Sequence, residues 1–256
     1  MRIAVLFDGA GLARLGLEQA GHDCIGYELD PVAHFLGQSV GSGRTMLGDA
    51  TAVDLRGFDA VWASPPCQAH SDARAGNEIG TPYAADLLGW SLALPERFPH
   101  LRAVWVENTP KGIVWNLAEA DRPPAWGTLY NAAQFLPIPL QNRNRMIGGR
   151  YAPPRTFHPW RKTFPGVCPT VTASEIKGGY SPEGNKRRAA KFYGRRLTLA
   201  ECGFHQGFPV PDSWGGGPDG PVPQGWGRYD WNTALYRAIG NGVPVYMARA
   251  FGAAYQ

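Results

Sequence analysis

Short apolar runs alternate with segments of helical periodicity through the first half of the chain. Residues 2–7 form a strand-like apolar run, and after a glycine-rich turn residues 12–20 carry apolar side chains at helical spacing. The same pattern predicts further strands over 24–28, 58–63 and 101–106, with a helix that begins at Pro31, a residue favoured in a first helical turn. Strands alternating with helices predict an α/β protein with a parallel sheet.

The predicted strands end in residues that suit a ligand site. The first strand leads into Gly9 and Gly11, the second ends at Glu28, the third runs into Cys67 in a proline-fixed loop, and the fourth stops at Glu107. Ligands of open α/β sheets bind beyond the carboxyl ends of the strands. We therefore expect one site at this edge of the sheet.

The second half of the chain has a different texture, which predicts a second, smaller domain. Beyond residue 146 proline, glycine, arginine and aromatic residues dominate and periodicity is weak. A helical pattern returns over 245–255, where its apolar residues can pack on the first domain. We expect a catalytic domain of residues 1–145 plus 240–256 and a small, irregular domain of residues 146–239.

Positive charge is concentrated in that second half, although the net charge is only +4. No acidic residue occurs between Arg122 and Ser174, and fourteen of the 25 basic residues lie between Arg122 and Arg196. Aromatic residues such as Tyr151 and Trp160 are interleaved with them. A solvated basic face is one interpretation of this pattern, and a surface that follows a phosphate backbone is the other.

The remaining composition narrows the class of protein. Four cysteines without a CxxC pair argue against a disulfide framework and a cysteine-based zinc site, so no metal is expected. The chain shows no apolar stretch of membrane-spanning length and no export signal. We expect a monomeric cytoplasmic protein that does not associate with a membrane.

The order of short motifs resembles that of the DNA cytosine-5 methyltransferase family. The matching segments are Phe7-Asp8-Gly9-Ala10-Gly11, Glu28, Gly48-Asp49-Ala50, Pro65-Pro66-Cys67-Gln68 with Ser71, Glu107-Asn108, Gln141-Asn142-Arg143-Asn144-Arg145, Pro169-Thr170-Val171-Thr172, Arg196-Leu197-Thr198, Gln206-Gly207-Phe208-Pro209 and Gly240-Asn241-Gly242-Val243-Pro244. The resemblance implies a Rossmann-like methyltransferase fold with a small DNA-recognition domain, S-adenosylmethionine as cofactor and double-stranded DNA as partner.

The resemblance also implies a role for each matching residue. The cofactor would be bound by Phe7, Gly9, Ala10, Gly11, Glu28, Leu29, Asp49, Ala50, Pro65, Asn241 and Gly242. Catalysis would rest on Cys67, Glu107, Arg143 and Arg145. DNA would be contacted by Gln68, Ser71, Gln141, Arg150, Arg155, Arg161 and Lys162.

The implied chemistry is covalent catalysis on a flipped-out cytosine. The Cys67 thiolate would add to C6, Glu107 would protonate or hydrogen-bond N3, and Arg145, helped by Arg143, would anchor O2. Three positions depart from the family pattern, namely Leu12, His70 and Thr109. Only 24 residues separate Arg145 from Thr170, where the family places its recognition segment, which predicts a short target of about two to three bases.

Three alternatives stay open at this point. Two are enzymes: a cytosine-5 methyltransferase that acts on RNA, and one that accepts a modified sulfonium donor. The third is a catalytically silent DNA-binding or protective protein. The presence of Cys67, Glu107, Gln141, Arg143 and Arg145 together weighs against the silent protein.

Overall fold

The computed structural model describes residues 1–66, 82–110, 127–171, 192–214 and 228–256. Its centre is a seven-stranded sheet in the order β3-β2-β1-β4-β5-β7-β6. The strands are β1 (Arg2–Leu6), β2 (Asp23–Glu28), β3 (Thr45–Leu47), β4 (Ala60–Ala63), β5 (Ala103–Asn108), β6 (Gly127–Asn131) and β7 (Asn144–Arg150). Strands β1 to β5 pair in parallel, while β7 runs antiparallel to both β5 and β6.

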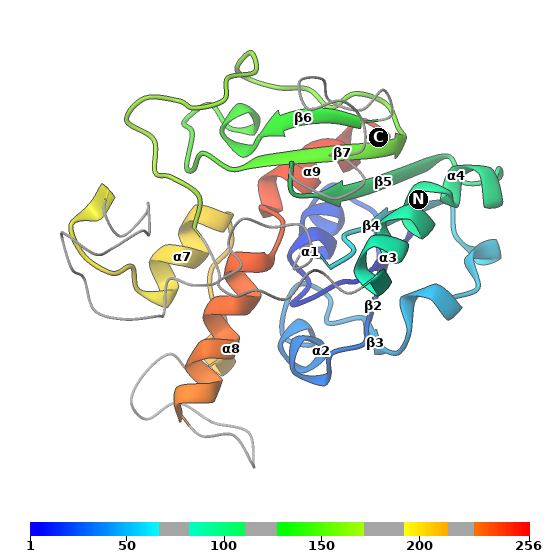
Figure 1. Cartoon of the computed structure of the whole chain (residues 1–256), viewed down its shortest axis with the longest axis horizontal. Helices are drawn as coiled ribbons and strands as arrows, with labels where there is room; N and C mark the ends of the chain where they lie inside the picture. Colours follow the sequence, from blue (N-terminus) through cyan, green and yellow to red (C-terminus); the bar gives the residue numbers. More distant parts are fainter. Residues whose placement is uncertain (67–81, 111–126, 172–191, 215–227) are drawn as a thin grey trace.

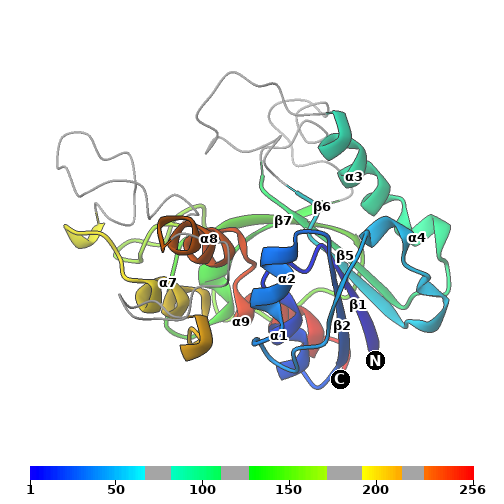
Figure 2. The ribbon, with the colours of Figure 1, turned by 90° about the horizontal axis from the view of Figure 1, so that it is seen from below.

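Helices cover both faces of this sheet, as Figures 1 and 2 show. The helices are α1 (Leu12–Gln19), α2 (Pro31–Gly37), α3 (Pro82–Leu92), α4 (Leu94–Arg97), α7 (Leu199–Gln206), α8 (Arg228–Asn241) and α9 (Val245–Ala253). Short 3₁₀ turns occupy Ala50–Ala52, Leu55–Gly57, Ala132–Phe135 and Asp212–Trp214. The α/β prediction is confirmed by this layered arrangement.

Successive residues of the central strands enter different cores because side chains alternate across a sheet. In β1, Ile3 and Val5 pack in the core that contains Leu17 of α1 and Phe251 of α9. Ala4 and Leu6 pack in the core on the other face, beneath α3 and α4. Burial on both faces explains why these strands appear as continuous apolar runs in the sequence.

A third core joins the two halves of the chain. It brings Leu12 of α1 and Leu36 of α2 together with Leu199 of α7 and Leu235 of α8. Trp214 is fully buried there, and its indole Nε1 donates to the Ser39 hydroxyl at 2.7 Å. The C-terminal helices are therefore packed directly against the first helices of the sheet.

The expected domain boundary at residue 146 falls inside β7. Residues 146–150 pair with β5, from Asn108 opposite Met146 to Val104 opposite Arg150. Those five residues thus belong to the central sheet, since their backbone groups complete its ladder. The division of the rest of the chain into two domains stays a prediction.

Candidate active site

The turn after β1 forms the floor of the site. Phe7 adopts a left-handed conformation with φ 58°, and Gly9 and Gly11 also have positive φ, at 57° and 83°. The turn is closed by a hydrogen bond from the Gly11 amide to the Asp8 carbonyl at 2.9 Å. A non-glycine residue in this conformation costs free energy, and such strain is common at ligand sites.

Glu28 at the end of β2 connects this turn to α2. Its Oε2 accepts the Gly9 amide at 2.7 Å and its Oε1 accepts the Asp30 amide at 2.8 Å. Asp30 in turn caps α2, because its Oδ1 accepts the Val32 amide at 2.8 Å. Glu28 is half-buried and lines the cavity described below.

A buried ion pair lies beneath the turn. Arg14 Nε donates to Asp8 Oδ2 at 2.9 Å, and both side chains are fully buried. Arg14 also donates to the carbonyls of Gly37 at 2.8 Å and Val40 at 3.0 Å. Burial raises the pKa of Asp8 from 3.8 to about 6, although the Arg14 charge lowers it. Gly26 is required beside this pair, since a Cβ there would collide with the Asp8 carboxylate.

A second ion pair stands at the end of β5. Glu107 Oε1 and Arg145 Nε are 2.6 Å apart, and their side chains are only 8% and 11% exposed. The neighbouring Asn108 donates from Nδ2 to the Pro65 carbonyl at 3.1 Å. This bond ties the end of β5 to the segment that leads from β4 to Cys67. Cys67, Gln68 and Ser71 themselves lie outside the described residues.

These groups border one cavity of about 880 Å³ at the carboxyl ends of the parallel strands. Among the predicted residues, its wall contains Phe7, Gly9, Ala10, Glu28, Leu29, Asp49, Ala50, Pro65, Glu107, Arg145, Asn241 and Gly242. The volume is within the range of small-molecule and cofactor sites. Of the described residues predicted to bind cofactor, Gly11 lies outside this wall; a side chain there would collide with Arg14.

Two buried residues of the QxRxR-like element donate hydrogen bonds to backbone carbonyls. Arg143 donates from Nη1 to the Val171 carbonyl at 2.7 Å and from Nη2 to the Gly240 carbonyl at 2.8 Å. Gln141 donates from Nε2 to the His205 carbonyl at 2.7 Å. Neither residue lines the cavity, and the expected roles of Arg143 in catalysis and of Gln141 in DNA binding stay predictions.

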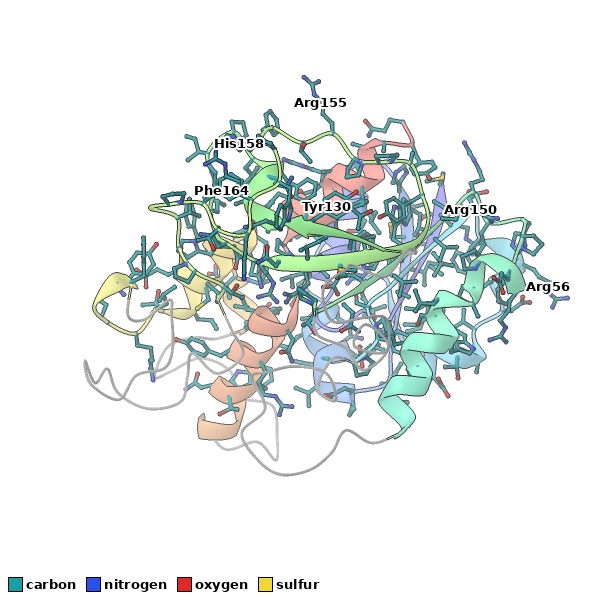
Figure 3. The ribbon with its side chains drawn as sticks, turned by 45° about the horizontal axis from the view of Figure 1, so that its top comes forward. Arg56, Tyr130, Arg150, Arg155, His158 and Phe164 are labelled. Carbon is teal, nitrogen blue, oxygen red and sulfur yellow. The ribbon has the colours of Figure 1, made fainter. Side chains whose placement is uncertain are left out.

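The predicted DNA-binding arginines and lysine are not gathered in one place. Arg150 lies opposite Val104, at the amino end of β5, and donates to the carbonyls of Pro99 and Leu101. Arg155 projects away from the body of the protein (Figure 3). The backbone carbonyls of Arg161 and Lys162 accept from Asn131 Nδ2 at 3.0 and 3.3 Å, at the end of β6. Only the last two are therefore held near the strand ends that border the cavity.

Sequence reasoning missed part of the cavity wall. Helix α8 contributes Thr233, Ala234, Arg237 and Ala238, and Asp8 and α2 also contribute. The α8 residues follow a region without a recognisable motif, so only their helical spacing could have indicated a shared face. Leu12, a departure from the family pattern, is buried, and a Cβ on Gly242 would meet it at 2.7 Å.

Comparison with known proteins tests the family resemblance and the fold. Residues 1–93 match the family model described as C-5 cytosine-specific DNA methylase. The predicted family resemblance is thus confirmed over that segment. It includes the glycine turn, Glu28, Asp49 and Cys67. No curated protein matches the chain by sequence.

Solved structures of methyltransferases share the fold over nearly the whole chain. The methyltransferase Dnmt2 of S. pombe is 12% identical with a TM-score of 0.58, and the match covers 98% of this chain and 97% of that one. The Entamoeba histolytica methyltransferase EhMeth is 13% identical with a TM-score of 0.59, covering 98% and 96%. A DNA modification methyltransferase described as putative and encoded within an E. coli prophage is 16% identical with a TM-score of 0.55, covering 99% and 98%. The predicted Rossmann-like methyltransferase fold is confirmed.

S-adenosylmethionine is the methyl donor that cytosine-5 methyltransferases of this fold use, as the motifs predicted. The cavity fits such a molecule in three respects. The positive-φ turn lets a ligand approach the backbone at Gly9, Glu28 can accept ribose hydroxyls, and Asp49 is exposed on the wall. Among the described residues, no helix is long and apolar enough to span a membrane, and no metal-ligating cluster occurs.

Proposed function

We propose that the protein is a DNA cytosine-5 methyltransferase in which Cys67 is the nucleophile. The observation that supports this function best is the shared cavity wall. It contains the glycine turn, the Glu107–Arg145 ion pair and Pro66, the residue immediately before Cys67. This shared wall supports the proposal that the cofactor, the base and the nucleophile meet in one cavity.

The proposed reaction requires the cytosine ring to lose its conjugation for a time. Addition of the Cys67 thiolate to C6 forms a carbon–sulfur bond and makes C5 electron-rich. The bound donor supplies an electrophilic methyl group. Once C5 carries the methyl group, loss of the C5 proton to a base expels Cys67 and restores the aromatic ring. The thiolate is regenerated, so the protein is unchanged by the cycle.

Glu107 and Arg145 would recognise the flipped base. Glu107 would donate a hydrogen bond or a proton to N3. This favours sulfur addition, because it stabilises the negative charge that the ring gains when the thiolate adds to C6. The Arg145 guanidinium has five N–H donors, of which Nε faces Glu107 and Nη1 donates to the Asn144 carbonyl at 2.8 Å. Within the described residues, the donors on Nη2 remain for the cytosine O2. The low exposure of both side chains strengthens these interactions by excluding water.

Double-stranded DNA is the substrate that we propose, with phosphate contacts from the basic second half of the chain. The family described for residues 1–93 and the exposed Arg161 and Lys162 support it. Because few residues are present for base readout between Arg145 and Thr170, a short target is expected. An RNA substrate, a modified sulfonium donor and a catalytically silent protein are the alternatives that the experiment below must exclude. We propose that it works in the cytoplasm in association with DNA.

A covalent trap tests the function. Wild type would be incubated with S-adenosylmethionine and duplex DNA or RNA that contains 5-fluorocytosine, whose fluorine cannot leave as a proton does. We expect a denaturation-resistant adduct with DNA, its absence in Cys67→Ala, and its retention in Cys24→Ala. Cys24 is a suitable control because burial raises the pKa of its thiol to about 12, which keeps it protonated.

The outcomes separate the alternatives. An adduct that forms with RNA and not with DNA would show that RNA is the substrate. An adduct that persists in Cys67→Ala would exclude the proposed nucleophile. Tight DNA binding with no adduct and no methyl transfer from S-adenosylmethionine would favour the silent protein or an enzyme that requires a modified sulfonium donor.

A further inference from the structure

One wall of the cavity is made by α8, and the part of this wall before Asn241 is not accounted for by any of the motifs. Thr233, Arg237 and Asn241 are spaced four residues apart, and all three line the cavity. Residues at this spacing lie on one face of a helix. Ala234 and Ala238 line the cavity beside them and leave room for a ligand. The helix therefore presents a polar stripe to whatever the cavity binds.

The charges on the cavity wall are unequal. Among the described residues, five acidic ones line it, Asp8, Glu28, Asp30, Asp49 and Glu107, against two arginines, Arg145 and Arg237; the Asp8 carboxylate itself is buried against Arg14. Such a wall attracts a ligand's cationic groups and repels its anionic ones. A ligand that carries a carboxylate needs a cation at the point where this group lies.

Arg237 is the cation that can meet this need. The wall's other guanidinium, Arg145, is 2.6 Å from Glu107. The wall carboxylates likewise have partners: Arg14 for Asp8, and backbone amides for Glu28, Asp30 and Asp49. Arg237 is exposed, and within the described ranges no hydrogen bond or ion pair engages its side chain. It keeps its full set of donors for a ligand.

Thr233 supports a ligand contact on the same face. Its Oγ1 is buried, and it has no hydrogen-bond partner within the part of the chain that the structure describes. A buried hydroxyl without a partner is costly, and a ligand group next to Arg237 would provide one. The wall thus offers a charge and a hydroxyl one helical turn apart.

We propose that Arg237 binds the carboxylate at the amino-acid end of the methyl donor. This inference rests on the proposed cofactor function of the cavity. If the ribose binds at Glu28 and the sulfonium faces Pro65 and Glu107, the amino-acid end would extend along the glycine turn. Helix α8 lies on that side, since Gly242 next to its last residue packs on Leu12. Arg237 forms a charge-assisted hydrogen bond with the carboxylate there.

Two ligands that differ by this carboxylate test the proposal. S-adenosylhomocysteine and its decarboxylated form, which keeps the amine, would be titrated calorimetrically into wild type, Arg237→Gln, Arg237→Lys and Arg249→Gln. Arg249 is the matched control, because it is an exposed helical arginine of α9 that does not line the cavity. The melting temperature without ligand reports whether each variant is folded.

We expect Arg237→Gln to weaken S-adenosylhomocysteine binding by roughly tenfold and to leave the decarboxylated ligand unchanged. Arg237→Lys should recover part of the loss, and Arg249→Gln should match wild type. Unchanged affinity in Arg237→Gln, or an equal loss for both ligands, would overturn the assignment. A smaller salt dependence of DNA binding alone would assign Arg237 to a phosphate instead. If wild type bound neither ligand, the proposed cofactor function itself would fail.

Discussion

At the residue scale, a buried ion pair between Asp8 and Arg14 supports the site. Asp8 occupies the glycine turn and Arg14 the first helix, yet the pair is out of contact with solvent. Arg14 also holds the carbonyls of Gly37 and Val40, so one side chain connects the turn to the end of α2 and the loop beyond it. Gly26 leaves the space for this pair, since any side chain there would displace the Asp8 carboxylate.

Asp8→Asn is expected to change how stability depends on pH. Desolvation raises the pKa of Asp8 from 3.8 to about 6 in the folded protein, against the lowering by Arg14 and with smaller raising effects of Glu28 and Glu18. The folded state therefore binds the proton more tightly than the unfolded state does. This contribution is fully present below pH 3.8 and is lost as the pH rises through about 6, by up to about 3 kcal/mol.

The measurement is urea unfolding of wild type and Asp8→Asn between pH 4 and pH 8. Asparagine cannot titrate, so the variant should gain stability relative to wild type as the pH rises through 6. Asp54→Asn is the control: hydrogen bonds from Arg56 lower the pKa of Asp54 to about 2, so its difference from wild type should stay constant from pH 5 to pH 8. A difference for Asp8→Asn that moves in the opposite direction would mean that Arg14 outweighs desolvation.

At the scale of elements, α1 and α9 pack closely against each other beside the cavity. A Cβ on Gly16 would meet the Val245 carbonyl and would lie 2.8 Å from Ala248 Cβ. The two helices approach this closely because a residue without a side chain lies between them. Helix α9 follows Asn241 and Gly242 of the cavity wall, so this packing positions the wall as well.

Gly16→Ala and Gly89→Ala should therefore have opposite effects. Overpacking at Gly16 is expected to lower the free energy of unfolding by about 1 to 3 kcal/mol. Gly89 is an exposed residue of α3 with no atom within 4 Å of an added Cβ, so alanine there should raise it by about 0.5 to 1 kcal/mol through helix propensity. Chemical denaturation of both variants decides this, and a Gly16→Ala variant as stable as Gly89→Ala would show that the helix contact is looser than described.

The same elements show how far the sequence alone could lead. The strands with continuous apolar runs, β1, β2, β4 and β5, were predicted within two residues of their bounds, as were α1 and α9. Strand β7 was not, because Gly148 and Gly149 have low strand propensity and its pairing with β5 is a long-range contact. Gly149 has φ 101°, and a side chain there would meet the Val104 carbonyl. Such a strand is specified by its neighbour and not by its own residues.

Helix α7 carried a local signal that the sequence analysis did not use. Thr198 and Glu201 form a capping box at its start, and Gly207 ends it in the left-handed conformation. The functional residues show a similar contrast. Motif order indicated Glu107 and Arg145 correctly as neighbours of the cavity, whereas the burial of Arg143 beneath Gly240 depends on a contact between residues distant in sequence.

At the scale of the whole molecule, the candidate DNA-binding residues Arg150, Arg161 and Lys162 lie at two different ends of the sheet. The carboxyl ends of β1, β4 and β5 border the cavity, and antiparallel β7 begins at that end with Asn144. Asn144 Nδ2 donates to the Lys162 carbonyl at 3.1 Å, which holds the backbone of this basic segment at the cavity end. Arg150 lies four residues further along β7 than Met146, a distance of about 14 Å in an extended strand.

This arrangement predicts that Arg161 and Lys162 contact the DNA backbone and that Arg150 does not. A duplex whose flipped base enters the cavity must pass over the strand ends beside it. Exposed cations held there can neutralise phosphates, whereas Arg150 is at the opposite end and already donates to two carbonyls. Each lost phosphate contact should reduce the slope of log K against log salt by about 1.

Fluorescence anisotropy with a labelled duplex at several salt concentrations measures this slope. The double variant Arg161→Gln/Lys162→Gln should reduce it by about 2 and weaken binding to all duplex sequences alike, because phosphate contacts carry no sequence information. Arg150→Gln should leave both slope and affinity unchanged, which makes it the control for a general change in net charge. If Arg150→Gln lowered the slope as much per charge as the double variant does, the duplex would have to lie along the whole length of β7. The strand ends at the cavity would then no longer define the approach of the DNA.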